Sequence, residues 1–246
     1  MQAEVLLFFG LLFIVAFLYS SVGHGGASGY LALMAIFAIS PIVMKPTALL
    51  LNLFVSSVSF FQFYRGGHFR WRIFWPFAVT SIPLSFLGGT MSIDNVPYKK
   101  ILGVLLLFPI IRFFFFKNTD PKDLKERNFA LSFLIGGIIG LLSGMIGIGG
   151  GIILSPILLL LKWTDQKQTA AISAAFIFVN SVAGLGGQLI KGITFNSDMI
   201  AYVVVAFIAG LLGAYFGALK FHQNILKNVL ACVLALAAYK LLFSHA

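Results

Sequence analysis

The sequence predicts an all-α, polytopic membrane protein, and three observations support that fold class. The chain has 246 residues, of which 60% are hydrophobic and only 10% are charged, whereas a soluble domain averages roughly 25% charged residues. Its mean hydropathy is +1.01. Its apolar stretches are continuous, as helical spans require, and do not alternate like the strands of a membrane barrel. These features exclude an ordinary soluble domain and a disordered chain.

The basic excess of the chain is explained by a membrane location. The net charge is +10, from 17 Lys and Arg against 7 Asp and Glu. The basic residues lie at the ends of apolar stretches, where the positive-inside bias places them. No polar domain is present that could bind nucleic acid, so we expect no such partner. The single cysteine, Cys232, excludes disulfides within the chain and multi-cysteine metal centres. We expect no metal and no cofactor.

Uncharged stretches of about the length of a membrane span recur along the chain. Those that need no further assumption cover residues 5–22, 46–64, 73–93, 129–161, 168–190 and 199–219. Residues 101–116 form another span if Arg112 reaches the membrane interface. Residues 228–239 belong to the last span. We expect about eight to ten membrane segments in total.

Two apolar regions are too long for a single span and must break. Residues 5–44 would form ~60 Å of helix and residues 129–161 ~50 Å, at 1.5 Å per residue. Each region contains a glycine cluster, Gly23–Gly26 in the first and Gly147–Gly151 in the second. We therefore predict that each region breaks at its cluster and continues as a short helix of ~13–15 residues.

The two clusters lie about half the chain apart, and later landmarks repeat at a similar offset; Gly88, for example, corresponds to Gly213. This spacing predicts an internal duplication. The expected units are a first membrane repeat over 1–117, a charged cytoplasmic linker over 118–127 and a second membrane repeat over 128–246. The distribution of Lys and Arg favours an odd number of crossings in each half, and hence inverted halves. Whether the short segments cross fully or are re-entrant stays open.

Glycine-interrupted short helices at matching positions of two repeats indicate a transporter's substrate site. Glycines that open a helix expose backbone N–H groups at the positive end of the helix dipole, which suits an anion. All 7 acidic residues lie in loops or at segment ends, although proton pumps and cation exchangers usually need a carboxylate inside the membrane. The sequence therefore favours an anion as substrate. Close helix packing at the glycines is the alternative interpretation.

A sparse set of polar residues lies near the breaks. Asn52 and Asn180 lie inside apolar spans, where an amide either donates to an anion or joins two helices through a hydrogen bond. His24 either supplies a switchable charge or caps a helix. Ser56, Ser181 and Gln188 are polar too but are not among the candidates. The candidate substrate-binding residues are Gly23, His24, Gly25, Gly26, Asn52, Ser143, Gly147, Gly149, Gly150, Gly151, Thr169 and Asn180.

One stretch fits an enzyme pattern. Residues 26–29, Gly-Ala-Ser-Gly, match the GxSG pattern of intramembrane serine proteases. Ser28 would need a base to take its proton. His24 is within reach only if the turn between them is helical, which its glycines oppose, and the other histidines lie in loops or at the terminus. We therefore expect that the protein is not an enzyme.

Taken together, the motifs resemble the sulfite exporter TauE/SafE family, also called the toluene-sulfonate uptake permease family. The resemblance rests on residues 21–26 and on 140–156, which are similar to the family pattern G-x-x-x-G-x-x-G-x-G-G-G-x-x-x-x-P. It covers essentially the whole chain. It implies a small sulfur-containing anion as substrate and seven or eight spans from a duplicated four-span unit. The first cluster has no counterpart of Pro156 and has His24 where the second has Ile148, which argues against a strictly two-fold site.

We therefore expect a multi-pass protein of the cell (inner) membrane that transports a sulfite, sulfonate or thiosulfate-like anion by alternating access. The alternatives are a non-transporting membrane assembly subunit and, third, an intramembrane serine protease. The expected partners are the anion and the lipid bilayer. The sequence leaves open the exact anion, the direction of transport, the coupling ion, carrier against channel, and whether the chain forms a homo-oligomer.

Overall fold

A computed structural model of the chain describes residues 2–21, 26–115, 124–193, 195, 197–219 and 234–243. These residues form helices and no strands, which confirms the expected all-α fold class. A further helical segment covers Leu234–Phe243. The labelled helices, in chain order, are α1 (Gln2–Ser21), α2 (Ala27–Ile36), α3 (Pro41–Arg65), α4 (Trp71–Thr90), α5 (Asn95–Phe115), α6 (Phe129–Ile146), α7 (Gly151–Leu160), α8 (Gln166–Ile190) and α9 (Ser197–Leu219).

Four of the described helices, α3, α4, α6 and α8, are long and apolar enough to cross a membrane by length and composition. Both over-long regions break where the glycine clusters predict. In the first, α1 ends at Ser21 and α2 begins at Ala27; in the second, α6 ends at Ile146 and α7 begins at Gly151. The placement of the second break is therefore confirmed, and α2 begins directly after Gly26, the last glycine of the first cluster.

The short helices are shorter than the expected ~13–15 residues, since α2 and α7 each have 10. After α2 the chain turns through Ala38, whose φ is 55°, and α3 then begins at Pro41. Proline is favoured in a first helical turn because its missing N–H would have no acceptor there. As a consequence α3 begins before the predicted span and includes Lys45, which the sequence analysis left outside it.

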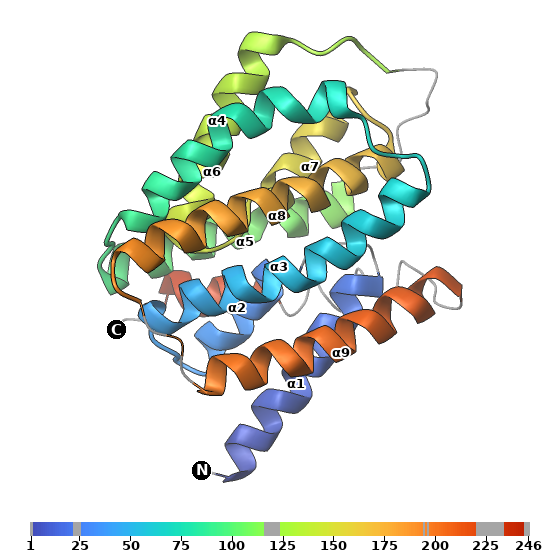
Figure 1. Cartoon of the computed structure of the whole chain (residues 1–246). Coiled ribbons are helices and arrows are strands. Elements are labelled where there is room, and N and C mark those ends of the chain that lie inside the picture. Colours follow the sequence, from blue (N-terminus) through green and yellow to red (C-terminus); the bar gives the residue numbers. More distant parts are fainter. Residues whose placement is uncertain are drawn as a thin grey trace.

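The described helices succeed one another in similar lengths in the two halves of the chain. The first half has helices of 20, 10 and 25 residues (α1 to α3), and the second has 18, 10 and 25 (α6 to α8). In Figure 1, α4 and α6 form one outer layer, α1 and α9 form the other, and α3 and α8 lie between them. Each outer layer thus pairs one helix from each half of the chain.

The two central helices run antiparallel. Leu49 of α3 lies against Gly184 of α8, and farther along α3 Asn52 lies near Ser181, which comes earlier in α8. Because α3 and α8 have the same place in their halves, this direction is the one that inverted halves predict. The boundaries of the two repeats stay a prediction, and most of the linker, 116–123, lies outside the described residues.

Glycines bring the outer helix pair α4 and α6 into close contact. Three glycines, each four residues from the next on α6, face the α4 backbone, and an added Cβ would overlap it. The pairs are Gly136 with Phe77, Gly140 with Ser81 and Gly144 with Ser85. In a bilayer, small residues at this spacing let two backbones approach and gain van der Waals contact. For these glycines the packing interpretation is therefore correct.

Candidate functional site

The second break is a short non-helical turn between α6 and α7. Gly147 follows α6 with a φ of 87°, and its N–H donates to the Ser143 carbonyl at 2.8 Å. Gly149 and Gly150 also have positive φ values, 76° and 77°. Residues with a Cβ rarely adopt this region, so glycine is needed for the chain to leave α6 and enter α7 within four residues.

Backbone N–H groups at the start of α7 have no backbone partner among the described residues. The first N–H groups of a helix have no acceptor within the helix. The N–H groups of Ile153 and Leu154 donate to the Gly150 carbonyl, at 3.1 and 3.0 Å. In the described part of the chain, the N–H groups of 148–152 donate to no backbone carbonyl. They lie at the positive end of the α7 dipole, where an anion is favoured.

Two polar side chains from different helices meet at Gly149. A Cβ on Gly149 would lie 2.6 Å from Asn52 Nδ2 on α3 and 3.4 Å from Ser181 Oγ on α8. Both side chains are completely buried, with 0% of their surface exposed. Gly149 is therefore glycine for two reasons, its positive φ and the closeness of Asn52. The predicted site residues Asn52 and Gly149 are thus brought together.

The side chains around this break lack hydrogen-bond partners. Among the described residues, neither Nδ2 nor Oδ1 of Asn52 has a partner, and the same holds for the hydroxyls of Ser56, Ser143 and Ser181. Ser56 lies one turn beyond Asn52, and Ser143 lies in the last turn of α6. Buried polar groups are nearly always paired, and each unpaired one costs about 1–3 kcal/mol. These unpaired polar groups make the second break the candidate site.

Asn180 lies next to Ser181 but is already partly engaged. Its Nδ2 donates to the Phe176 carbonyl at 2.9 Å, and its own backbone carbonyl accepts from Ser85 Oγ at 2.8 Å. Only its Oδ1 has no partner among the described residues. Because an anion needs donors and Oδ1 is an acceptor, Asn180 suits the predicted role less well than Asn52 does.

Thr169 lies away from the break. Its hydroxyl contacts the Asp165 carbonyl and the Thr164 hydroxyl, each at 2.7 Å, in the first turn of α8. Along α8 it lies eleven residues before Asn180, or ~16 Å at the helical rise. The structure therefore does not bring Thr169 to the other candidate residues, and its hydroxyl serves to close the start of α8.

The first break is described only at its end. Gly23, His24 and Gly25 lie outside the described residues, so the facing of the two breaks stays a prediction. Gly26 precedes α2, and the Tyr30 ring lies against it. The hydroxyls of Ser28 and Tyr19 share a buried hydrogen bond of 2.7 Å, so the partner that the structure gives Ser28 is a tyrosine.

Sequence reasoning missed Lys45, a partly buried cation beside the second break. A Cβ on Gly147 would lie 2.9 Å from the Lys45 carbonyl oxygen, which places α3 directly against the turn. The Lys45 Nζ lies 5.2 Å from the centre of the Tyr98 ring, and the Tyr98 hydroxyl donates to the Ile146 carbonyl at 2.9 Å. A lysine just before a predicted span was the available signal, but it was assigned to a loop.

Gln188 is another buried polar side chain of α8. The contact of Leu49 with Gly184 sets a register that brings Gln188, one turn farther along α8, toward the α3 turn of Lys45. Gln188 is 2% exposed, and neither atom of its amide has a partner among the described residues.

Comparison with known proteins shows the family of the chain. The chain matches the family "Sulfite exporter TauE/SafE" over residues 8–241. It is 33% identical over 237 residues to the probable membrane transporter protein y4hK of Sinorhizobium fredii, covering 94% of this chain and 95% of that protein. A probable membrane transporter protein of Methanocaldococcus jannaschii is 28% identical over 215 residues, or 82% and 79% of the two chains. No solved structure matches the chain. The chain is thus a multi-pass membrane protein that belongs to the sulfite exporter TauE/SafE family of membrane transporters.

Proposed function

We propose that the protein moves a small sulfur-containing oxyanion across the membrane by alternating access and binds it at the second break. One observation carries this proposal: the buried polar groups around Gly149, foremost the Asn52 amide, have no partners among the described residues. The family supports transport, and its name supports sulfite and export. Binding by Gly147, Gly149, Gly150, Gly151, Asn52 and Ser143 is part of the proposal.

The donors at the break suit an oxyanion. The site offers the backbone N–H groups of 148–152, the Asn52 amide and the hydroxyls of Ser143 and Ser181. Hydrogen bonds from neutral donors to a charged acceptor contribute about 1.5–3 kcal/mol each. Several of them hold an anion without a permanent ion pair, so the anion can also leave. Lys45 adds a positive charge beside the break, which attracts anions toward it.

The burial of the site supports alternating access. Because Asn52 and Ser181 are both 0% exposed, an anion reaches them only when packed helices separate. The central helices α3 and α8 run antiparallel past the site. Inverted halves around a central site open it to one side and then to the other by equivalent movements of each half. We therefore propose that the described arrangement is a closed state between the two open ones.

Counterflow in proteoliposomes tests the function without assuming a direction of transport. Vesicles loaded with unlabelled sulfite should take up radiolabelled sulfite, and uptake should saturate and be competed by thiosulfate or a sulfonate. Uptake no greater than that of protein-free vesicles, with all three anions, would contradict transport and favour the assembly-subunit alternative. Flux that rises linearly with concentration and shows no counterflow would instead indicate a channel.

A further inference from the structure

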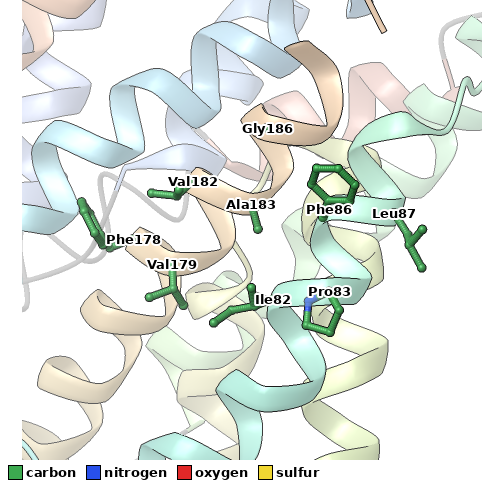
Figure 2. A pocket seen from close by; sticks show the side chains of 9 residues that line it. All are labelled: Ile82, Pro83, Phe86, Leu87, Phe178, Val179, Val182, Ala183 and Gly186. Carbon is green, nitrogen blue, oxygen red and sulfur yellow. The ribbon is translucent and has the colours of Figure 1, made fainter. Parts of the chain in front are cut away.

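An apolar groove lies between α4 and α8, apart from the polar site. It has a volume of about 810 Å³ and is lined by nine residues without a charged or hydrogen-bonding side chain. Figure 2 shows Ile82, Pro83 and Phe86 of α4 opposite residues of α8 across this groove. Val182 and Leu87, at its edges, are 50% and 51% exposed. Because it has no polar lining, this groove is unsuited to an oxyanion.

A second cavity continues the groove toward the start of α4. It measures about 750 Å³. It shares Ile82, Phe178 and Val179 with the first cavity, so the two form one continuous groove along the surface of the helices. Its far end is aromatic, with Tyr64, Phe69, Phe74, Trp71 and Trp75 among its lining residues. Tryptophan and tyrosine concentrate at the membrane interface, so this end marks the level of the lipid headgroups.

Basic residues surround the aromatic end. Arg70 and Arg72 flank Trp71, and both are exposed. Arg127 stacks its guanidinium over the Phe129 ring at 4.0 Å, and Phe129 lies 5.9 Å from Trp75. Among the described residues, the buried Nε and Nη1 of Arg127 have no hydrogen-bond partner. Desolvation, and secondly the positive charge of Arg72, lower the pKa of the Arg127 guanidinium. Within the described residues, no ion pair neutralises either arginine.

We propose that this groove binds one anionic phospholipid, with an acyl chain between α4 and α8 and the phosphate at Arg72 and Arg127. The charges match, because a phosphate diester supplies an anion for guanidinium groups that have no carboxylate partner among the described residues. The length matches as well: from Trp71 to Leu87 the groove follows α4 for ~24 Å, which exceeds half of a ~30 Å hydrocarbon core. One leaflet's acyl chain therefore fits along it.

Quenching of tryptophan fluorescence by brominated lipids tests the proposal in purified protein. Trp71 and Trp75 line the groove, whereas Trp163 is 6% exposed and lies elsewhere in the core. Brominated phosphatidylglycerol should quench at lower concentration than brominated phosphatidylcholine. The extra quenching should be lost in Trp71→Phe/Trp75→Phe and retained in Trp163→Phe. Equal quenching by the two lipids in the unmodified protein would overturn the proposal.

Charge variants test the headgroup contact. Arg72→Gln/Arg127→Gln should raise the half-saturating concentration of brominated phosphatidylglycerol about 30-fold, from two lost interfacial charges. Arg72→Lys/Arg127→Lys keeps both charges and should retain most of the preference. Lys99→Gln/Lys100→Gln removes two charges from α5 and should change nothing.

Two further results would also overturn the proposal. The first is a loss of the phosphatidylglycerol preference in the α5 pair as large as in the arginine pair. The second is the displacement of brominated lipid of either headgroup by toluenesulfonate, which would make the groove a substrate site. Both readouts are independent of sulfite counterflow, so a failure of this proposal is distinguishable from a failure of the proposed transport.

Discussion

Replacement of Asn52 by leucine distinguishes the two roles that a buried amide can have in this fold. If the amide joins helices, its loss destabilises the protein. If it binds the anion, its loss weakens transport while the fold is retained. The structure favours the second role, because neither Nδ2 nor Oδ1 of Asn52 has a partner among the described residues. Leucine is similar in size, so it fills the same space without burying a polar group.

The expected changes in stability and in sulfite affinity follow from two free-energy contributions of the Asn52 amide. A buried polar group without a partner costs about 1–3 kcal/mol, so Asn52→Leu should raise the free energy of unfolding of the empty protein by about that amount. A hydrogen bond from an amide to a charged acceptor contributes about 1.5–3 kcal/mol. Its loss should weaken sulfite binding about ten- to hundredfold. Stability and affinity are thus expected to change in opposite directions.

Thermal unfolding with and without sulfite measures both quantities on one sample. Without sulfite, Asn52→Leu should melt at a higher temperature than the unmodified protein. Added sulfite should raise the melting temperature of Asn52→Leu less than that of the unmodified protein. Asn128→Ala is the matched control. Its Oδ1 accepts the Leu131 N–H at 3.1 Å at the start of α6, so its loss should cost about 1 kcal/mol of stability. Sulfite affinity should be unchanged in this control.

The opposite pattern in Asn52→Leu would refute the reasoning. A lower melting temperature together with unchanged sulfite affinity would show that the Asn52 amide is a structural hydrogen-bonding group. The anion site would then have to lie elsewhere, and Gly149 would be glycine only for its backbone conformation and for packing.

Three further predictions concern other parts of the molecule. Ser181→Ala should raise the KM for sulfite about tenfold without lowering the melting temperature. Thr169→Val should lower the melting temperature and leave the KM unchanged, because only the Thr169 hydroxyl is already hydrogen-bonded. Transport kinetics measure the KM values and thermal unfolding measures the melting temperatures. Lys45→Gln should slow sulfite uptake more at low than at high ionic strength, and an equal loss across a salt series would contradict a steering role. Gly88→Ala should lower stability because its Cβ would overlap the α6 backbone. Gly10→Ala, whose Cβ meets nothing within 4 Å, should be neutral or stabilise by about 0.5–1 kcal/mol. Equal melting temperatures of the two variants in thermal unfolding would contradict this prediction.

The breaks were predictable because they depend on lengths and on local backbone preference. An apolar run too long for one span has to bend, and a glycine cluster is where it bends at least cost. The same local reasoning could not tell one glycine from another. Gly149 allows a positive φ beside Asn52, whereas Gly140 lets two helices touch, although both belong to the same motif of residues 140–156.

The membership of the site was predictable only in part. Asn52 stood out as an amide in an apolar span, and the structure brings it to Gly149 as a site requires. Ser181 and Thr169 are both small hydroxyl residues of α8, and the sequence analysis selected Thr169. Only the helix start at Asp165 and the packing of α8 against the turn show that Thr169 is bonded locally and that Ser181 faces the break.

The sequence by itself determined the membrane class, the helical fold, the two breaks and the family. Hydrophobic length, charge placement and glycine conformation are properties of a segment, so a single chain reveals them. Only the tertiary structure decided which polar groups meet, which residues of α3 and α8 lie opposite each other, and that Lys45 lies beside the turn. These features depend on contacts between residues far apart in the chain, because whether a buried group is paired depends on what packs against it.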